Sequence, residues 1–181
     1  MDTLREITLP ETKPAMEWVD GRAVQKVSPT RKHSLLQSSF LRCLYDWKTG
    51  RGEVGAEWRF RLTPPGERTR PLVPDVAYIS YESLDPLTPA ERETPPVAPD
   101  IVVEILSPAD SSRDIDAKRG VYLSCGVQLV LIVDPEKRSV EAFDRDGNHD
   151  TIGAVDAYVP PSFPSLVFPL RAMFDELNYG R

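Results

Sequence analysis

The chain has 181 residues, of which 40% are hydrophobic and 28% charged, and its formal net charge is -6. This is a globular composition, long enough for one core and short for two, so we expect a single domain over residues 1–181. No apolar run approaches the roughly 20 residues of a membrane-spanning helix, and residues 1–10 lack the apolar core of a signal peptide. The two cysteines, Cys43 and Cys125, are too few for a disulfide framework and have no zinc-ligand spacing. We therefore expect a cytoplasmic protein, and its negative charge disfavours one that merely coats nucleic acid.

The first 50 residues predict a hairpin followed by a helix. Asp20-Gly21 separates two short apolar segments, 16–19 and 23–27, and this dipeptide readily supplies the positive φ angles of a tight turn. Thr30 can cap a helix, and apolar residues recur at helical spacing over residues 32–47. The pattern predicts an amphipathic helix there.

The next segment predicts strands and a long loop. Residues 53–62 alternate between apolar and polar side chains, which is the period of one half-buried strand. Residues 73–79 predict a further strand after a proline-rich turn. Residues 80–99 contain five prolines with charges between them, so we expect a long surface loop.

The centre of the chain has the strand, helix, strand order of a parallel crossover. Residues 101–106 are aliphatic apart from Glu104, which is typical of a buried central strand. A helix is expected from Ser111 or Ser112 to about Ser124, ended by Gly126, and residues 127–133 predict the next strand. The two strands should be parallel, joined by a right-handed crossover.

Two weaker strands are expected at residues 139–143 and 151–159. Together the elements predict an α/β fold, in which a mixed central sheet is flanked by helices and preceded by an N-terminal hairpin.

Two carboxylates are the first candidates for chemistry. Glu104 interrupts an aliphatic strand, and a charge buried there must either pair within the fold or bind a cation. Asp75 opens an earlier strand, 29 positions before Glu104 (104 minus 75). Asp75 could simply cap backbone amides. If the two strands are neighbours, both carboxylates point to one place, and hard oxygen ligands of this kind suit Mg²⁺ or Mn²⁺.

Basic residues are the second group of candidates. Lys118 lies on the helix that follows Glu104. Phosphodiester hydrolysis needs positive charge near the phosphorus, although a lone helical lysine is ordinarily solvated. Four arginines also gather in one segment, where they could contact phosphates or form a solvated face: Arg59, Arg61, Arg68 and Arg70.

The order and spacing of several segments resemble the Uma-two (Uma2) family of restriction-endonuclease-like proteins, which belongs to the PD-(D/E)XK nuclease superfamily. The resemblance runs through residues 16–21, 28–30, His33, Pro74-Asp75, 102–108, 114–119, Tyr122, Gly126 and 132–135. It implies a restriction-endonuclease-like fold over nearly the whole chain. It also implies a Mg²⁺- or Mn²⁺-dependent endonuclease acting on nucleic acid, with DNA the expected substrate.

The same resemblance implies roles for particular residues. Asp75, Glu104 and the backbone carbonyl of Ile105 would bind the metal, and Lys118 would complete the catalytic set. The superfamily usually carries a lysine two positions after the second carboxylate, where this chain has Leu106, so Lys118 would replace it from the helix.

Three further residues could support the site: Glu17, His33 and Tyr122. Glu17 could add a third carboxylate. His33 either forms a hydrogen bond at the helix start or contacts the phosphate or a water on the metal. Tyr122 either packs in the core beside the site or takes part in it.

Other functions fit some of the same residues. The missing strand lysine and the acidic balance also fit a non-catalytic nucleic-acid- or protein-binding module that keeps the nuclease fold. A carbohydrate-active enzyme could use Asp75 and Glu104 as an acid/base pair. A homodimer is expected for an endonuclease that addresses two strands.

Overall fold

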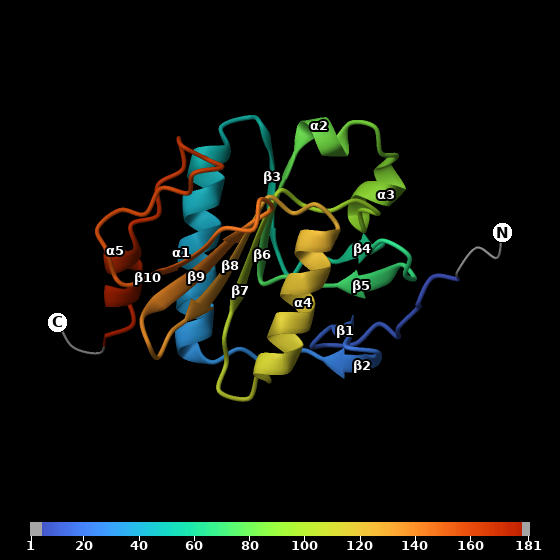
Figure 1. The fold of residues 1–181 in the computed structure, drawn as a ribbon, viewed down its shortest axis with the longest axis horizontal. Coiled ribbons are helices and arrows are strands. Elements are labelled where there is room, and N and C mark those ends of the chain that lie inside the picture. Colours follow the sequence, from blue (N-terminus) through green and yellow to red (C-terminus); the bar gives the residue numbers. More distant parts are fainter. Residues whose placement is uncertain (1–4, 179–181) are drawn as a thin grey trace.

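The computed structural model describes residues 5–178, which form a mixed α/β fold (Figure 1). The strands are β1 (Met16–Val19), β2 (Arg22–Gln25), β3 (Gly52–Ala56), β4 (Phe60–Leu62), β5 (Arg70–Leu72), β6 (Val76–Ser80), β7 (Ile101–Ile105), β8 (Leu129–Asp134), β9 (Ser139–Asp144) and β10 (His149–Ile152). The helices are α1 (Arg31–Lys48), α2 (Tyr81–Leu84), α3 (Pro89–Glu93), α4 (Ser112–Ser124) and α5 (Leu170–Asp175).

A six-stranded sheet organises the molecule, with the strand order β10-β9-β8-β7-β6-β3. Its centre is the parallel pair β7 and β8, joined by α4, and its other neighbouring strands are antiparallel. The parallel crossover predicted from the sequence is confirmed. Both central strands consist mainly of fully buried aliphatic residues, as expected for strands that are covered on both faces.

Alternate residues of the central strands point to two separate cores. Ile101, Val103 and Ile105 of β7 pack toward α1 and α5 in one core. Val102 packs on the opposite face, in the core that includes Tyr122 of α4. Figure 1 shows α1 and α5 on one side of the sheet and α4 with the two small hairpins on the other. Because strand side chains alternate with period two, Glu104 must point toward α4.

The N-terminal hairpin forms as predicted, with β1 and β2 antiparallel around the Asp20-Gly21 turn. Both turn residues have positive φ, 48° for Asp20 and 76° for Gly21. α1 begins at the expected cap, where the Thr30 side chain accepts a hydrogen bond from the His33 N–H. This places the first turn of α1 close to the start of β6.

The single strand predicted over residues 53–62 is wrong. It is two strands in different sheets, since β3 joins the central sheet and β4 pairs with β5. The chain leaves the sheet at Glu57, whose φ is 52°, a left-handed conformation that does not continue a strand. The alternating pattern runs through this break and therefore hides it.

The strand predicted over 73–79 is shorter, because β5 ends at Leu72 and β6 begins at Val76. Pro74 lies in the gap and has no N–H to donate to a ladder. Residues 80–99 are not one loop, since α2 and α3 form there and Thr88 with Glu91 makes a capping box at α3. The last predicted strand is β10, at His149–Ile152 rather than 151–159, and α5 was not predicted.

None of the helices formed by residues 5–178 combines the length and the apolar character needed to cross a membrane.

Two glycines give a test of the sheet. A Cβ on Gly52 of β3 would overlap the Ile79 carbonyl oxygen and lie 2.7 Å from the Tyr78 ring, whereas a Cβ on Gly120 of α4 would meet nothing within 4 Å. We expect Gly52→Ala to destabilise the fold by about 1–3 kcal/mol through overpacking. Gly120→Ala should stabilise it by about 0.5–1 kcal/mol through helix propensity. Urea unfolding of both variants measures this, and equal stabilities would contradict the β3–β6 packing.

Candidate functional site

Asp75 and Glu104 lie opposite each other at one end of the sheet. β6 and β7 pair with Val76 opposite Val103 and Ala77 opposite Val102. Extending this antiparallel register by one residue places Asp75 opposite Glu104 (75 + 104 = 76 + 103). Side chains at directly opposed positions share a face with Cβ atoms roughly 5 Å apart. Both side chains are almost fully buried, with 2% and 3% of each residue exposed.

Helix α4 supplies the partners of Glu104. Lys118 Nζ lies 2.7 Å from Glu104 Oε1, and the Tyr122 hydroxyl donates to the same oxygen at 2.6 Å. Burial raises the pKa of Glu104 to about 7 against the opposing effect of Lys118, and the negative charge of Asp75 adds to the rise. Glu104 therefore takes up a proton more readily than Asp75 does.

Lys118 bridges two carboxylates. Its Nζ also lies 3.1 Å from both oxygens of Glu17, which comes from β1. Burial alone would lower the pKa of Lys118, but Glu104 and Glu17 raise it above its usual value, so the ammonium stays charged. Glu17 is fixed in turn, because its Oε1 accepts the Val73 N–H at 2.7 Å.

Asp75 has a different set of partners. Its Oδ2 accepts the Ile105 N–H at 2.7 Å and lies 3.1 Å from His33 Nε2. Its Oδ1 accepts a hydrogen bond from Lys26 Nζ at 2.6 Å. Burial opposes ionisation, but the His33 hydrogen bond and the Lys26 charge outweigh it and hold the pKa of Asp75 well below its usual range. Asp75 is thus an ionised carboxylate at any ordinary pH.

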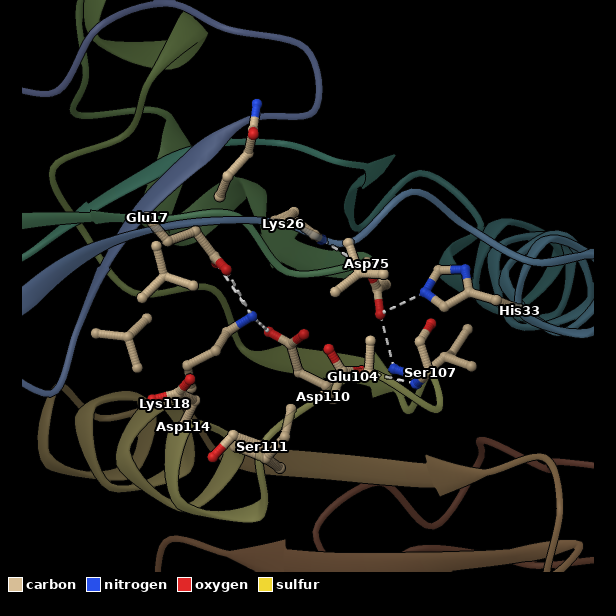
Figure 2. A pocket seen from close by; sticks show the side chains of 17 residues that line it. Glu17, Lys26, His33, Asp75, Glu104, Ser107, Asp110, Ser111, Asp114 and Lys118 are labelled. Carbon is tan, nitrogen blue, oxygen red and sulfur yellow. Dashed lines mark hydrogen bonds and ion pairs between the residues drawn. The ribbon is translucent and has the colours of Figure 1, made fainter.

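These side chains line one pocket of about 200 Å³ between the N-terminal hairpin, the end of β7 and the start of α4. Figure 2 shows Lys118 reaching between Glu17 and Glu104, while Asp75 lies between Lys26 and His33. Two more acidic residues line the pocket, Asp110 and Asp114. Burial raises the pKa of Asp110, which caps the turn after β7 by accepting the Ser107 N–H at 2.6 Å.

The donor set of the pocket fits a small hard cation. Within residues 5–178, no three His, Cys, Asp or Glu side chains are arranged to hold a metal ion. Magnesium nevertheless needs only one or two protein carboxylates, because it keeps several waters and takes substrate phosphates as its other ligands. Asp75 and Glu104 provide two carboxylates on one face, and the charge of Asp75 disfavours that of Glu104. A cation between them would relieve that repulsion.

The structure brings together the residues to which the family resemblance assigns roles. Asp75, Glu104, Ile105, Lys118, Glu17 and His33 line the pocket, and Tyr122 reaches Glu104 from behind it. Tyr122 is fully buried in the core and also donates a hydrogen bond to Glu104, whereas a part in the chemistry of the site stays a prediction. His33 combines a helix-start position with a contact to Asp75. The Ile105 N–H holds Asp75, whereas metal binding by its carbonyl stays a prediction.

Sequence analysis missed Lys26 and Asp110. Lys26 follows β2, and its side chain is only 10% exposed. Its partner Asp75 is 49 positions away, which local patterns cannot connect. In the structure Val24 and Lys26 are half-buried while Ala23 and Gln25 are exposed. The sequence alone does not show which side of the hairpin faces inward, so the buried position of Lys26 could not be predicted from it.

The arginine cluster is occupied by acidic and backbone partners. Arg61 forms two hydrogen bonds of 2.6 Å to Glu6, and Arg59 pairs with Glu11. Arg68 donates to the Arg5 carbonyl, and Arg70 pairs with Glu67. Three of these arginines therefore hold the N-terminal segment against β4 and β5. This is a structural role, and the cluster supports no phosphate-binding surface by itself.

The fold and the site define a restriction-endonuclease-like class of protein, and comparisons with known proteins agree. The family model described as "Uma2: Putative restriction endonuclease" matches residues 2–171. The chain therefore belongs to the Uma2 family. A solved structure described as a putative nuclease belonging to DUF820, from Anabaena variabilis ATCC 29413, is 28% identical with a TM-score of 0.80. The match covers 92% of this chain and 93% of that one. No curated protein matches.

The contact between His33 and Asp75 makes stability depend on pH. Burial alone would lower the pKa of His33, but Asp75 raises it above its usual 6.5. A histidine with a raised pKa stabilises the fold fully below the unfolded-state pKa and loses this contribution as pH rises through the folded-state pKa. We expect His33→Asn to cost about 1.5–3 kcal/mol at pH 6 and less at pH 9.

Urea unfolding of the wild type and His33→Asn at several pH values measures the difference. His149→Asn is the matched control, because His149 is exposed on β10. A cost for His33→Asn that stays constant from pH 6 to pH 9 would show that the histidine acts as a neutral hydrogen-bond donor.

Proposed function

We propose that this protein is a metal-dependent endonuclease that hydrolyses phosphodiester bonds in nucleic acid, with DNA as the substrate. Membership of the Uma2 family and the likeness to a nuclease suggest nuclease activity. The observation that carries the finer proposal is the placement of Asp75 opposite Glu104, with Lys118 2.7 Å from Glu104. Two carboxylates and a buried ammonium around one pocket are the groups that this reaction requires.

Asp75 and Glu104 would hold a divalent cation, with the Ile105 carbonyl as a further oxygen donor. A bound divalent cation supplies positive charge beside the scissile phosphate and makes a nearby water more nucleophilic. His33 and the Ile105 N–H fix the orientation of Asp75, and Tyr122 fixes that of Glu104. These groups fix the orientation of the two carboxylates before a cation binds.

Lys118 would stabilise the negative charge that develops on the phosphate. Lys118 lines the pocket and is only 5% exposed as a residue, and its ammonium lies between Glu17 on one side and Glu104 on the other. A fixed cation in a poorly hydrated site stabilises transition-state charge far better than a mobile surface lysine. The helix thereby offers the ammonium that Leu106 cannot offer from the strand.

Cleavage of plasmid DNA in Mg²⁺ or Mn²⁺ tests the proposal. We expect the wild type to cleave and Asp75→Asn or Glu104→Gln to lose at least about 10²-fold in rate, because each removes a charged ligand. Lys118→Met should lose about 10²–10³-fold in rate without losing metal affinity, because Lys118 is not a metal ligand. Asp116→Asn, on the exposed side of α4, is the matched control. Equal cleavage by wild type and Asp75→Asn would mean that a contaminant cuts the DNA.

A second candidate function is a binding module that keeps the nuclease fold without the reaction. The observation in its favour is that Asp75 and Glu104 already have lysine partners, so their charges are balanced without a metal. Thermal unfolding in Mn²⁺ separates the two. A site that binds metal gains about 2.7 kcal/mol at a concentration 100 times the Kd, and Asp75→Asn should lose this gain. A wild type without any Mn²⁺-dependent shift would support the binding module.

A further inference from the structure

Lys26 is a buried cation that the proposed reaction does not use. Its Nζ lies 2.6 Å from Asp75 Oδ1, 2.8 Å from the Val73 carbonyl oxygen and 3.1 Å from Glu57 Oε2. Lys26 donates hydrogen bonds to Asp75 and to the Val73 carbonyl, and its third close contact is the ion pair with Glu57. Burial alone would lower the pKa of Lys26, but the charges of Asp75, Glu104 and Glu17 raise it, so the side chain is a cation.

Lys26 occupies the oxygen of Asp75 that a metal would need. Oδ2 is already shared by the Ile105 N–H and His33, whereas Oδ1 has Lys26 as its side-chain partner. A divalent cation on Oδ1 would lie within a few ångströms of the ammonium. Repulsion between two such charges in a poorly hydrated pocket is large, so both cannot keep their full contact with this oxygen.

Glu57 is a second carboxylate with which the Lys26 ammonium can pair. It is the second ion-pair partner of Lys26, and its side chain is 47% exposed compared with 3% for Asp75. Gln37 donates to its Oε1 at 3.1 Å, and the backbone N–H of Glu57 donates to the Asp75 carbonyl at 3.3 Å. Glu57 also has the left-handed φ of 52°, a costly conformation for a residue with a side chain. The chain thus holds an accessible carboxylate beside Lys26.

Lys118 has no comparable alternative. Its two partners, Glu17 and Glu104, are 5% and 4% exposed at the side chain, and both belong to the inner wall of the pocket. A cation that displaced Lys118 would leave it buried between the same acids. The two lysines therefore differ in whether they can change partners. Of the two, only Lys26 has an exposed carboxylate among its partners within residues 5–178.

We propose that Lys26 is an exchangeable internal counter-ion of the metal site. In the metal-free protein its ammonium neutralises Asp75, and when a divalent cation binds Asp75 the ammonium shifts its pairing to Glu57. Lys26 is then a positioning residue that sets metal affinity and keeps the empty pocket from carrying unbalanced charge. This inference rests on the proposed metal-dependent function.

Calorimetric titration with Mn²⁺ at constant ionic strength tests the exchange in five proteins: wild type, Lys26→Met, Glu57→Gln, the double variant and Lys32→Met. Lys32→Met is the matched control, because Lys32 forms an exposed ion pair with Glu136 at 2.8 Å. We expect Lys26→Met to bind Mn²⁺ about tenfold more tightly, or about 1.4 kcal/mol, because the competing charge is gone. Glu57→Gln should bind about threefold more weakly, since Lys26 loses its second partner.

The double variant distinguishes exchange from a general effect of charge. If Glu57 acts through Lys26, Glu57→Gln changes nothing once Lys26 is Met, whereas a long-range charge effect would weaken binding equally in both backgrounds. Additive effects would therefore overturn the inference. So would a gain in Lys32→Met equal to that in Lys26→Met, or unchanged or weaker Mn²⁺ binding by Lys26→Met.

The remaining outcomes separate this inference from the proposed function. A wild type that binds no Mn²⁺ overturns the metal-dependent function and the exchange with it, whereas a wild type that binds while Lys26→Met shows no gain overturns the exchange alone. If Lys26→Met does not fold, Glu57→Gln decides, because its side chain is half-exposed. Unchanged affinity in Glu57→Gln would then contradict the exchange, and weaker affinity would support it.

Discussion

The structure of the site depends on compensating the cost of burying two carboxylates side by side. The pairing of β6 with β7 places Asp75 opposite Glu104, and neither side chain has more than a few per cent of its surface in water. An isolated buried carboxylate costs several kcal/mol, and two of them on one face cost more. The elements around the pocket offset this cost with cations and hydrogen bonds. Helix α4 supplies Lys118 and Tyr122 to Glu104. Helix α1 supplies His33 to Asp75, and the hairpin supplies Lys26 to the same residue.

Neutralising these two buried carboxylates requires cations from elements that are far apart in the chain. The β1–β2 hairpin packs on β5 and α4, where it brings Glu17 to Lys118 and Lys26 to Asp75. Each contact pairs opposite charges. The hairpin therefore forms one wall of the pocket and also balances its charge. Removing one partner would leave the other buried and unpaired, which is the most destabilising change that such a cluster can suffer. Stability and the proposed function therefore depend on the same side chains.

Much of this site could be predicted from the sequence, because its main residues interrupt local patterns. Glu104 stands out within an aliphatic strand, and Asp75 stands out after Pro74 at the start of another. What could not be predicted were features that need the third dimension. The break at Glu57 lies inside an unbroken alternation, and it is the backbone that turns there. Lys26 has a role in the site only because the hairpin folds so that its side chain reaches Asp75, and no local sequence pattern encodes that contact.

The balance of charge in the pocket also bears on how an acidic protein could act on a polyanion. The net charge of -6 opposes binding of DNA at long range, and three arginines of the cluster already pair with acids and backbone of the N-terminal segment, while Arg70 pairs with Glu67. The pocket carries positive charge of its own in Lys26 and Lys118, but carboxylates neutralise it. A divalent cation on Asp75 and Glu104 would change this, because it would add positive charge to the pocket that a phosphate could contact directly. In the proposed function, metal binding would then favour substrate binding as well as the chemical step, since the carboxylates would no longer repel the phosphate.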